Sequence, residues 1–552
     1  MACLPSTCPF CACGCGVLLQ EDAGRLLASY PSTAPPARSS LCIRGWHCTS
    51  PVSSPDRLVA PLIRGTSGLV PATWQEAVSE VAGRLASARS RPLFVVGPTV
   101  ANEDAAAVAH LAQRLDGQLC TSDLSGASAA RWALDQVVPG ARGNLDPEAI
   151  SAADLLWVIG LDTSGCPQVA GRVTGARRRG ATVVRFDVQL SSADNSSVVA
   201  MPPESVGELG RLLERAARPE GSDGADTGGG AAWLSAEAAR ALVAGFRAAR
   251  RPVAIVGGRW LSSDGAESNT IALLRALAHL GAADRVVFAV GESNSWGVLD
   301  VLGPGAPAAE IACRAEGLDT VVVVADDLVR RSPRPDATAG TLSRLDTLVV
   351  VDRFPTHTTA RAHVVLPSCT FAEADGWVTS LFGEARPWRR IVPPPGGAEP
   401  ERIWMARIGE ALGAGTGKAK ASPCVDGKAE ASPCNGSDFP YQVVLSSHAA
   451  AFSTGVMTSR DDVLRREANE SMLTASPAAL KATGLKPGSP ARLVVPGGEV
   501  TVTVHADHRI PDEVLVLVPL PGSAAAAVRG CYPARGGRTV GLQPVPARLE
   551  RA

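Results

Sequence analysis

Several features that would assign a chain to a class at once are missing from this sequence. No apolar run approaches the roughly 18 residues that a membrane-spanning helix needs. The first cysteine cluster begins within eight residues of the N-terminus, which leaves no room for a signal peptide or a twin-arginine leader. Positive charge is not in excess, since 53 Lys and Arg face 54 Asp and Glu, so a large nucleic-acid surface is excluded. These absences predict a cytoplasmic protein with no transmembrane segment and no nucleic-acid partner.

Composition also excludes a disulfide scaffold and a disordered chain. The 14 cysteines are too dilute for a disulfide framework, and clustered thiols in a reducing compartment more often bind metal. Hydrophobic residues make up 45% and charged residues 19%, which is enough for several buried cores. At roughly 150 residues per domain, the length predicts three or four domains.

Short apolar strands alternate with helices through most of the chain, a pattern typical of parallel sheets buried on both faces. Strands are expected at 92–97, 155–160, 182–187, 253–257, 286–290, 320–325 and 347–352, with helices at 75–88, 102–115, 235–249 and 269–280. A tandem repeat at 417–424 and 427–434 has the composition of a linker. Beyond it, strands expected at 441–445, 491–495, 499–505 and 513–518 predict a barrel-like domain.

Cysteines at metal-ligand spacing crowd the N-terminus. A C-x2-C-x3-C loop is followed after 26 residues by a fourth thiol, which gives the set Cys8, Cys11, Cys15 and Cys42. Four thiolates suit a [4Fe–4S] cluster or a structural zinc ion, and the uneven spacing favours the cluster. Cys13 and Cys48 are near enough to replace a ligand, or else they are small buried hydrophobic residues.

The segments CPFCACGCG (8–16), LCIRG (41–45) and SPDRLVAPLIR (54–64) resemble the cluster domain of the molybdopterin-dinucleotide (bis-MGD) oxidoreductases, and among these the formate dehydrogenase large (alpha) subunits. The resemblance implies a [4Fe–4S] cluster. Arg44 stands where the family usually has a lysine between cluster and pterin. Because Arg44 keeps the positive charge, a role in the electron relay is expected.

Three further segments resemble the family's dinucleotide-binding loops in the family's order. The segment VIGLDTSGCP (158–167), together with the end of the next strand, contributes Gly160, Asp162 and Asp187. The loop GESNSWG (291–297) contributes Gly291, Ser293 and Asn294, and the stretch 352–376 contributes Asp352, Thr356, Thr358, Glu373 and Asp375. The resemblance implies that these residues bind pterin or nucleotide, whereas the alternative for each is ordinary turn and loop polarity.

The C-terminal segment 446–460 resembles the family's last dinucleotide-binding loop, with His448, Gly455, Met457, Thr458 and Arg460 as its candidate residues. The resemblance implies bis-molybdopterin guanine dinucleotide holding molybdenum or tungsten. It also implies an α/β multidomain fold with one doubly wound parallel domain inserted in another. The expected segments are a cluster domain at 1–60, an α/β domain at 61–110 plus 320–415, an inserted α/β domain at 111–319, a linker at 416–437 and a β-barrel-like domain at 438–552.

One family element is hard to find. Catalytic members supply a cysteine, selenocysteine, serine or aspartate to the metal, and that residue should fall between about 118 and 135. Cys120 is the first candidate, although a buried strand cysteine would look the same, and the further candidates are Asp123, Ser125 and Ser128. Arg131 could bind an anionic substrate, but no histidine is near.

Three functional interpretations follow. The first is a formate dehydrogenase-like enzyme that exchanges two electrons with a small molecule, formate among the candidates, at molybdenum or tungsten. Its cluster would relay the electrons to a partner subunit linked to NAD, ferredoxin or quinone. The second is a catalytically silent electron-transfer subunit resembling the large iron–sulfur subunit of NADH–quinone oxidoreductase. The third is a zinc-stabilised binding protein.

Overall fold

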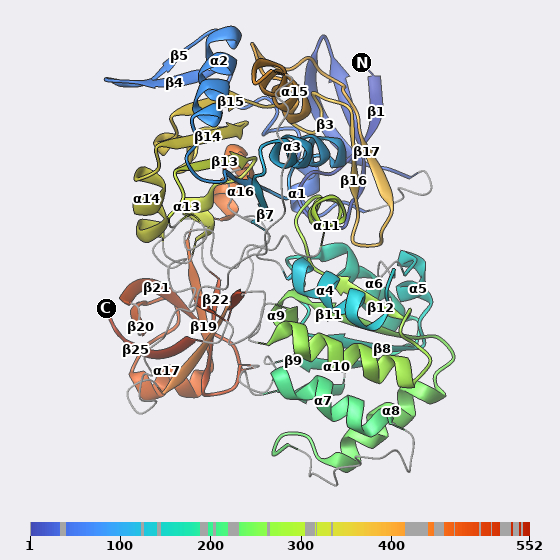
Figure 1. The fold of residues 1–552 in the computed structure, drawn as a ribbon. Helices are drawn as coiled ribbons and strands as arrows, with labels where there is room; N and C mark the ends of the chain where they lie inside the picture. Colours follow the sequence, from blue (N-terminus) through green and yellow to red (C-terminus); the bar gives the residue numbers. More distant parts are fainter. Residues whose placement is uncertain are drawn as a thin grey trace.

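The computed structural model describes residues 2–33, 40–122, 126–140, 145–187, 197–201, 206–218, 231–261, 265–303, 315, 317–332, 335–413, 440–445, 457–468, 470–495, 498–508, 510–518, 531–533, 540–542 and 545–552. The cysteine-bearing sheet and a seven-stranded sheet occupy the upper half of Figure 1, and a five-stranded sheet and a barrel lie below them. Within these ranges, no helix combines the length and apolar character that crossing a bilayer requires.

The N-terminal unit is a small antiparallel sheet that carries the cysteine loop. Its strands, in the order β1-β2-β3, are β1 (Ala2–Thr7), β2 (Gly16–Asp22) and β3 (Arg25–Pro31). The loop between β1 and β2 contains three of the four expected cluster cysteines, and the fourth directly precedes the short helix α1 (Ile43–Trp46). The sheet therefore brings the loop and the return segment to one end of this unit.

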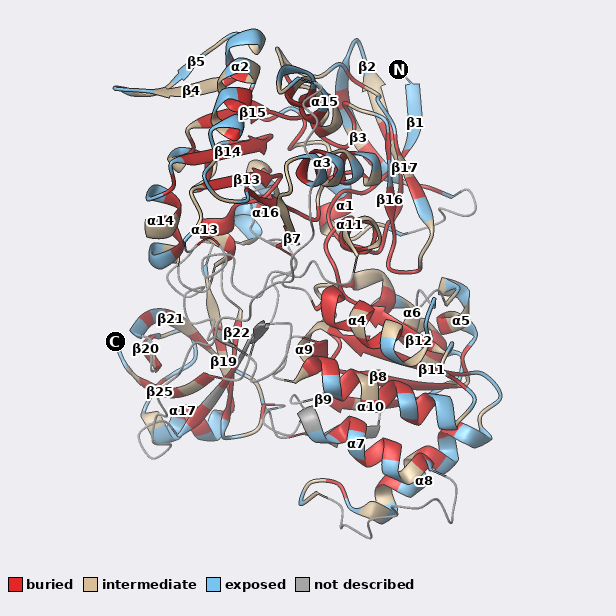
Figure 2. Cartoon of the chain, in the orientation of Figure 1, coloured by how far each residue is buried: buried red, intermediate tan, exposed pale blue. Residues whose placement is uncertain are grey.

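The seven-stranded sheet has a parallel core extended by an antiparallel hairpin. Its order is β5 (Gly68–Pro71), β4 (Leu62–Gly65), β15 (Val364–Pro367), β14 (Thr347–Asp352), β13 (Thr320–Val324), β6 (Leu93–Val96) and β7 (Gln118–Thr121). In β13, Val322 and Val324 face one apolar cluster while Val321 and Val323 face another, so the strand is buried on both faces. Figure 2 shows the same burial across β13, β14 and β15. The helices of this unit are α2 (Trp74–Ala86), α3 (Asn102–Arg114), α13 (Leu328–Arg331), α14 (Pro335–Ser343) and α15 (Glu401–Ala411).

The five-stranded sheet is parallel throughout. Its order is β10 (Ser197–Ala200), β9 (Thr182–Asp187), β8 (Leu155–Ile159), β11 (Pro252–Gly257) and β12 (Val286–Ala289). The helices of this part of the chain are α4 (Ala127–Val137), α5 (Pro147–Ala152), α6 (Pro167–Arg178), α7 (Val206–Ala217), α8 (Ala236–Ala248), α9 (Gly258–Leu261), α10 (Ala266–His279) and α11 (Ser295–Leu302). Its apolar core is continuous with the residues of the cysteine loop, so the two units share one buried cluster.

The C-terminal strands close into a barrel. Around the barrel they run β18 (Tyr441–Leu445), β22 (Val514–Val518), β19 (Met472–Ala475), β21 (Gly498–Ala506), β20 (Pro490–Val495) and β25 (Val545–Arg551). In the same C-terminal part of the chain, α17 (Pro477–Thr483) lies beside the barrel (Figure 1). The helix α16 (Asp462–Glu467) and the short turn η3 (Thr458–Arg460) before it lie instead near the seven-stranded sheet (Figure 1). The other described elements are the short turn η2 (Thr359–Arg361) and two hairpins, β16 (Gly376–Thr379) with β17 (Ala385–Trp388) and β23 (Cys531–Pro533) with β24 (Val540–Leu542).

These elements confirm the predicted fold class of two parallel α/β sheets, a cysteine domain and a barrel. The expected linker repeat lies outside the described residues. Strand β7 falls inside the segment expected as the inserted domain, yet it pairs with β6 of the seven-stranded sheet. The domain limits therefore stay a prediction, and the sheets are the units used below.

Each parallel sheet has one point where its strand order reverses. In the five-stranded sheet, β9 and β10 lie on one side of β8 while β11 and β12 lie on the other. In the seven-stranded sheet, β7 flanks β6 on one side while β13, β14 and β15 follow on the other. Open parallel sheets bind ligands beyond the carboxyl ends of the two strands that flank such a point. The fold therefore provides two candidate ligand positions, at β8/β11 and at β6/β13.

Candidate cofactor-binding site

The four expected cluster cysteines come together in the structure. Cys8, Cys11 and Cys15 are buried, and Cys42 is close enough to act on Cys11 and Cys15 electrostatically. The pKa of the Cys8 and Cys15 thiols is raised well above the ordinary value, mainly by burial and to a smaller extent by the neighbouring sulfurs. Buried thiols such as Cys8 and Cys15, which resist deprotonation, are stabilised as thiolates by a bound metal. The donor set therefore fits a metal cluster.

Across the described part of the chain, no group of three or more His, Cys, Asp or Glu side chains is placed to hold one metal ion. A [4Fe–4S] cluster binds each thiolate at a different iron, so its cysteines stand farther apart than the ligands of one zinc ion. Cys13 and Cys48 also lie within this group, Cys13 beside Cys11 and Cys48 beside Cys8. Which cysteines act as ligands stays a prediction.

Arg44 connects the cysteine loop to the first expected dinucleotide loop. Its side chain is fully buried, and its Nη2 donates to the carbonyl oxygens of Ser164 at 2.9 Å and Gly165 at 3.3 Å. Burial by itself lowers the pKa of Arg44, but the sulfurs of Cys11 and Cys42 raise it above its usual value. A buried guanidinium requires compensating negative charge. Thiolates bound to a cluster supply that charge, so Arg44 also fits the predicted cluster.

The carboxyl edge of the five-stranded sheet gathers the three residues expected there. Gly160 directly follows β8 with φ of 56°, and a Cβ at this position would lie 2.8 Å from the backbone nitrogen of Trp260. The glycine is therefore required for packing against the chain itself, not only for the approach of a ligand. Asp187 at the end of β9 forms an ion pair with Arg259, which Asp162 also influences electrostatically. No sequence motif indicated Arg259, although it comes directly after β11 and the two glycines at 257 and 258.

The loop 291–297 pairs with the cysteine loop. The backbone nitrogen of Ala12 donates to the carbonyl of Gly291 at 3.0 Å, and that of Ser293 donates to Phe10 at 2.9 Å. A Cβ on Gly291, whose φ is 107°, would lie 3.0 Å from the Cβ of Ala12. The two loops therefore form one buried seam.

Within that seam, the two polar candidates differ in what remains open to a ligand. The Asn294 amide donates to the Val100 carbonyl and the Asn102 side chain at 2.8 Å each, and it accepts from the Thr379 backbone at 2.6 Å. Its hydrogen-bonding groups are thus used by the chain. The buried Ser293 Oγ has no hydrogen-bond partner within the described ranges. Buried hydroxyls without partners are rare, so Ser293 fits a bound polar group.

The same seam contains a buried ionic group that sequence analysis did not identify. Arg331 Nη1 contacts Glu292 Oε1 at 2.6 Å, and Arg331 Nε contacts Asp326 at 2.9 Å. Asp326 follows the end of β13, so this group joins the loop 291–297 to the reversal point of the seven-stranded sheet. No sequence motif indicated this ionic group, because Glu292 lies far from Asp326 and Arg331 in the sequence.

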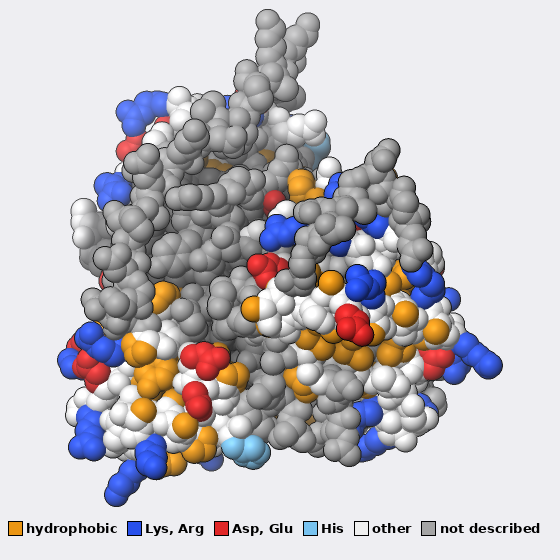
Figure 3. Space-filling view, turned by 90° about the horizontal axis from the view of Figure 1, so that it is seen from below, with side chains coloured by type: hydrophobic (Ala, Val, Ile, Leu, Met, Phe, Trp, Pro, Cys, Tyr) orange, Lys and Arg blue, Asp and Glu red, His pale blue; other side chains and the backbone are white. Residues whose placement is uncertain are grey.

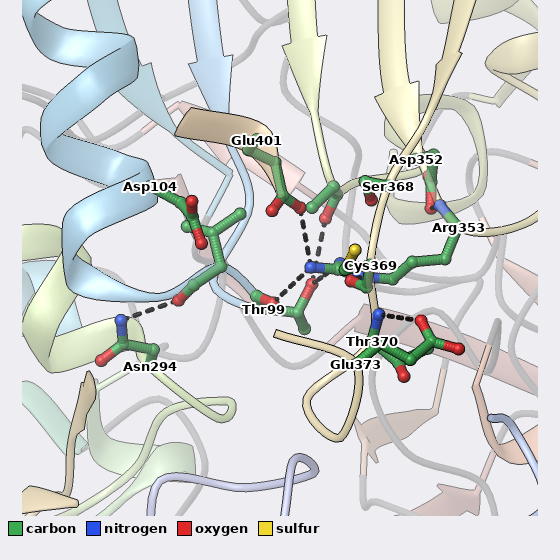
Figure 4. Close-up of polar contacts among 12 residues, drawn as sticks. Thr99, Asp104, Asn294, Asp352, Arg353, Ser368, Cys369, Thr370, Glu373 and Glu401 are labelled. Atoms are coloured by element: carbon green, nitrogen blue, oxygen red, sulfur yellow. Dashed lines mark hydrogen bonds and ion pairs between the residues drawn. The ribbon is translucent and has the colours of Figure 1, made fainter. Parts of the chain in front are cut away.

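Glu373 and Asp375, expected near the second dinucleotide, hold the chain together. The Glu373 carboxylate forms a two-point pair with Arg57 at 2.5 and 2.8 Å and accepts from the Thr370 backbone at 2.7 Å. Asp375 Oδ1 accepts from the Arg390 backbone at 3.2 Å. The Thr370 Oγ1, which lies beside Glu373 in Figure 4, is buried and has no partner among the described groups. Of these side chains, Thr370 is the one left open to a ligand.

The remaining candidates of this stretch form a second set of internal contacts. Thr358 Oγ1 donates to Asp327 Oδ1 at 2.8 Å, and Thr356 exchanges hydrogen bonds with Thr359. Asp352 is buried and accepts from the next backbone nitrogen at 2.6 Å. Burial raises the pKa of Asp352 to about 6. These residues lie at or after the carboxyl ends of β13 and β14, and their recorded contacts are made within the chain.

Arg353 is the centre of the contacts in Figure 4. It donates to Glu401 at 2.8 Å, to the Thr99 carbonyl at 2.9 Å and to the Cys369 carbonyl at 2.7 Å. Thr99 follows the end of β6, and Glu401 begins α15. Arg353, which directly follows β14, therefore joins the segments after β6 and β15 to the start of α15, a role that no sequence motif indicated.

Cys120, the first candidate for a protein ligand to the catalytic metal, lies in an apolar cluster with Leu93 and Val95 and is fully buried. This is the environment of the strand cysteine that was the alternative. Asp123 and Ser125 lie outside the described residues. The assignment of a protein ligand stays a prediction.

Arg131, on α4, has an ionic partner in the chain. Its Nη2 lies 2.5 Å from Asp300, and its guanidinium stands over the Trp296 ring at 5.4 Å. An anionic substrate would have to compete with Asp300 for this charge. Ser128, also on α4, has a buried Oγ with no partner in the described structure.

Three of the five residues expected in the C-terminal loop are described. Arg460 lies 3.4 Å from Asp56 and stands over Phe354 at 5.1 Å. It therefore contacts both the segment 54–64 and the stretch 352–376, two of the segments that resemble the family. Thr458 is buried and Met457 half-buried, whereas the other two, His448 and Gly455, lie outside the described residues. Figure 3 shows the molecule from below, the side of the barrel and the five-stranded sheet.

Comparison with known proteins decides the family. The family described as molybdopterin oxidoreductase matches residues 57–408, and the molybdopterin oxidoreductase Fe4S4 domain matches residues 1–54. The chain belongs to the molybdopterin oxidoreductase family. This membership confirms the predicted molybdopterin cofactor and [4Fe–4S] cluster.

Similar molybdopterin oxidoreductase sequences come from several complexes. The chain is 27% identical to the NADPH-Fe(3+) oxidoreductase subunit alpha of Geobacter sulfurreducens over 71% of its own length and 54% of the relative's. It is 31% identical to the F420-dependent formate dehydrogenase subunit alpha of Methanocaldococcus jannaschii over 35% of this chain and 29% of the relative. It is 24% identical to an NADH-quinone oxidoreductase subunit of Streptomyces coelicolor over 96% of this chain and 69% of the relative. The chain thus spans about half the length of the first curated relatives that it matches.

Among solved structures, acetylene hydratase from Pelobacter acetylenicus has the same fold. The match covers 99% of this chain and 100% of that one, with a TM-score of 0.74 and 13% sequence identity. At this identity the likeness concerns the fold alone.

Proposed function

We propose that this molybdopterin oxidoreductase is the large, cofactor-bearing subunit of a formate dehydrogenase-like enzyme. The observation that supports the proposal is the buried contact of Arg44 with the loop at Ser164 and Gly165. This contact holds the expected cluster site against the expected pterin site, with water excluded from the side chain between them. A fixed positive charge between two electron-carrying groups favours the reduced, more negative state of each.

The chain's own residues divide the work of binding. Cys8, Cys11, Cys15 and Cys42 would hold the cluster, and the polar atoms at the two reversal points would hold the pterin dinucleotides. When bound, molybdenum or tungsten on the pterins exchanges electron pairs with a substrate, and the cluster carries electrons singly. The partner subunit would be linked to NAD, ferredoxin or quinone.

The substrate is proposed to be a small molecule, and formate is the first to test. The support is the resemblance of the cluster-domain segments to formate dehydrogenase large subunits, together with the formate dehydrogenase alpha relative at 31% identity. Arg131 is the candidate anion-binding residue, and it would need to release Asp300 to bind formate.

The test is metal and nucleotide analysis of protein purified without oxygen, followed by a formate-dependent viologen-reduction assay. We expect about four iron, one molybdenum or tungsten and two GMP released by acid per chain. Formate-dependent reduction supports the formate dehydrogenase-like assignment. Full metal content without formate turnover overturns that substrate but keeps the cofactor assignment.

A second function is favoured by one specific observation. Cys120 lies in an apolar cluster, and Arg131 is paired with Asp300, so neither of these catalytic candidates stands open to a substrate. This arrangement suits an electron-transfer subunit that performs no substrate chemistry. Four iron with neither molybdenum nor tungsten in the purified protein would support this function and exclude the first.

A further inference from the structure

Two cysteines that are not among the four expected cluster ligands meet beside the cysteine loop. Cys13 lies in the loop between β1 and β2, and Cys166, far away in sequence, directly precedes α6. Both side chains are buried, Cys13 being 6% and Cys166 3% exposed, and their thiols form a hydrogen bond. This contact joins the cysteine domain to the segment that follows β8.

The backbone around Cys166 fixes the position of its thiol. Arg44 donates to the carbonyl oxygens of the two residues that directly precede Cys166, at 2.9 and 3.3 Å. The backbone nitrogen of Cys166 donates to the carbonyl of Asp162 at 3.2 Å. Cys166 is the N-cap residue of α6, yet its side chain accepts no capping hydrogen bond. Its thiol is instead bonded to that of Cys13.

On its other side, the Cys13 thiol forms a hydrogen bond with Cys11, one of the expected cluster ligands. A sulfur bound to iron is a thiolate, which accepts hydrogen bonds and has no proton to donate. Cys13 is outside the expected ligand set, and a buried thiol is stable in its neutral, protonated form. With the cluster in place, Cys13 is therefore the donor and Cys11 the acceptor. A hydrogen bond to a charged acceptor is stronger than one between neutral groups.

Cys48 offers a contrast within the same group of thiols. It is fully buried, as Cys13 nearly is, and it influences Cys8 through charge. Its hydrogen bond, however, is made with the Ser29 side chain. Cys48 is therefore a matched control, because it is a buried thiol beside the cluster ligands whose hydrogen bond goes elsewhere.

We propose that Cys13 donates an S–H···S hydrogen bond to the iron-bound sulfur of Cys11, and that Cys166 is the positioning residue that holds Cys13 for this bond. Hydrogen bonds to the sulfurs of an iron–sulfur cluster stabilise its reduced, more negative state and so raise its reduction potential. The inference goes beyond the proposed function, because it requires the cluster and no particular substrate. It applies equally to an enzyme and to a subunit that only transfers electrons.

The experiment measures the reduction potential of the cluster in the full chain, purified without oxygen, by a redox titration followed by electron paramagnetic resonance. We expect Cys13→Ala to keep its full iron content and to shift the potential to a more negative value. Cys13→Ser keeps a donor and should recover much of this shift, and Cys48→Ala should match the wild type. An unchanged potential in Cys13→Ala, a serine variant as negative as the alanine variant, or loss of iron from Cys13→Ala would overturn the inference.

A double-mutant cycle tests whether Cys166 acts through Cys13. Cys166→Ala should shift the potential in the same direction by a smaller amount, because Cys13 loses the contact that orients its thiol. In the double variant Cys13→Ala/Cys166→Ala, we expect the shift of Cys13→Ala alone, since the bond that Cys166 supports is already absent. No shift in Cys166→Ala, or shifts that add in the double variant, would overturn the positioning role of Cys166.

Discussion

The buried guanidinium of Arg44 donates a 2.9 Å hydrogen bond to the backbone carbonyl of Ser164, 120 residues away in sequence. It belongs to the cysteine domain, whereas Ser164 belongs to the loop that follows the first strand of the five-stranded sheet. The same side chain interacts with the sulfurs of Cys11 and Cys42. One residue therefore connects the two parts of the chain between which electrons are expected to move.

Replacing Arg44 with Met should shift the reduction potential of the cluster to a more negative value. Loss of a buried positive charge beside the thiolates destabilises the reduced cluster, by an amount on the order of 100 mV. A redox titration followed by electron paramagnetic resonance measures the shift. Arg44→Lys keeps the charge and is the matched control. Equal potentials in Arg44→Met and the wild type would show that this charge does not act on the cluster.

Removing the expected cluster ligands should release iron, whereas removing the extra thiols should not. We expect Cys8→Ala to lose most of its four iron atoms, because a cluster with an open corner is labile. Cys48, which is fully buried beside Cys8 and Cys42, is the control. Cys48→Ala should retain the full iron content in a colorimetric assay and the same visible absorption. Iron loss in Cys48→Ala but not in Cys8→Ala would reassign the ligand.

The sheets could be predicted from sequence because parallel strands buried on both faces give short apolar runs. The run at 320–324 is almost entirely valine, and its side chains alternate between two apolar clusters in the structure. The position of β7 could not be predicted, because a four-residue strand of mixed burial carries no signal of which sheet it joins. Strand partners depend on contacts between distant residues, which local periodicity does not record.

The candidate site shows the limit of motif analysis more sharply. Motifs located the polar residues at both reversal points but could not tell side chains that the chain itself uses from those left open. Asn294 and Glu373 fill their hydrogen-bonding groups within the protein, whereas Ser293 keeps a buried hydroxyl without a described partner. The distinction depends on residues such as Arg57 and Asn102, which lie far away in sequence.

Glu373 should act on stability through Arg57 rather than on cofactor binding. The two side chains are 2% and 3% exposed, so Glu373→Gln leaves an uncompensated buried charge and should cost about 3–5 kcal/mol. Changing both residues to Met removes that charge and should recover much of the loss. Thermal unfolding midpoints test this, and acid-released GMP provides the second measurement. If Glu373 binds nucleotide directly, the double variant will recover stability without recovering GMP.

Cys120 should be dispensable for metal binding. Its place in the apolar cluster with Leu93 and Val95 predicts that Cys120→Ala costs about 1 kcal/mol of stability and leaves molybdenum or tungsten content unchanged. Metal analysis together with thermal unfolding checks both parts. Ser128→Ala is the informative comparison, because the Ser128 hydroxyl is buried without a described partner. Loss of the metal in Cys120→Ala alone would restore Cys120 as a ligand.

Asp352 should make the protein less stable as pH rises toward neutrality. Burial raises its pKa from 3.8 to about 6, so between these values the folded state binds the proton more tightly than the unfolded state. The neutral Asp352 carboxyl therefore makes its full contribution to the free energy of unfolding below about pH 4. This contribution declines as pH increases and is lost above the pKa of the folded state. A difference of about two pKa units corresponds to a change on the order of 3 kcal/mol. Asp352→Asn keeps an acceptor for the Arg353 backbone nitrogen and removes the titration. Measured from pH 4 to 7, its thermal midpoint should rise relative to that of the wild type, and parallel curves would show that Asp352 does not titrate in this range.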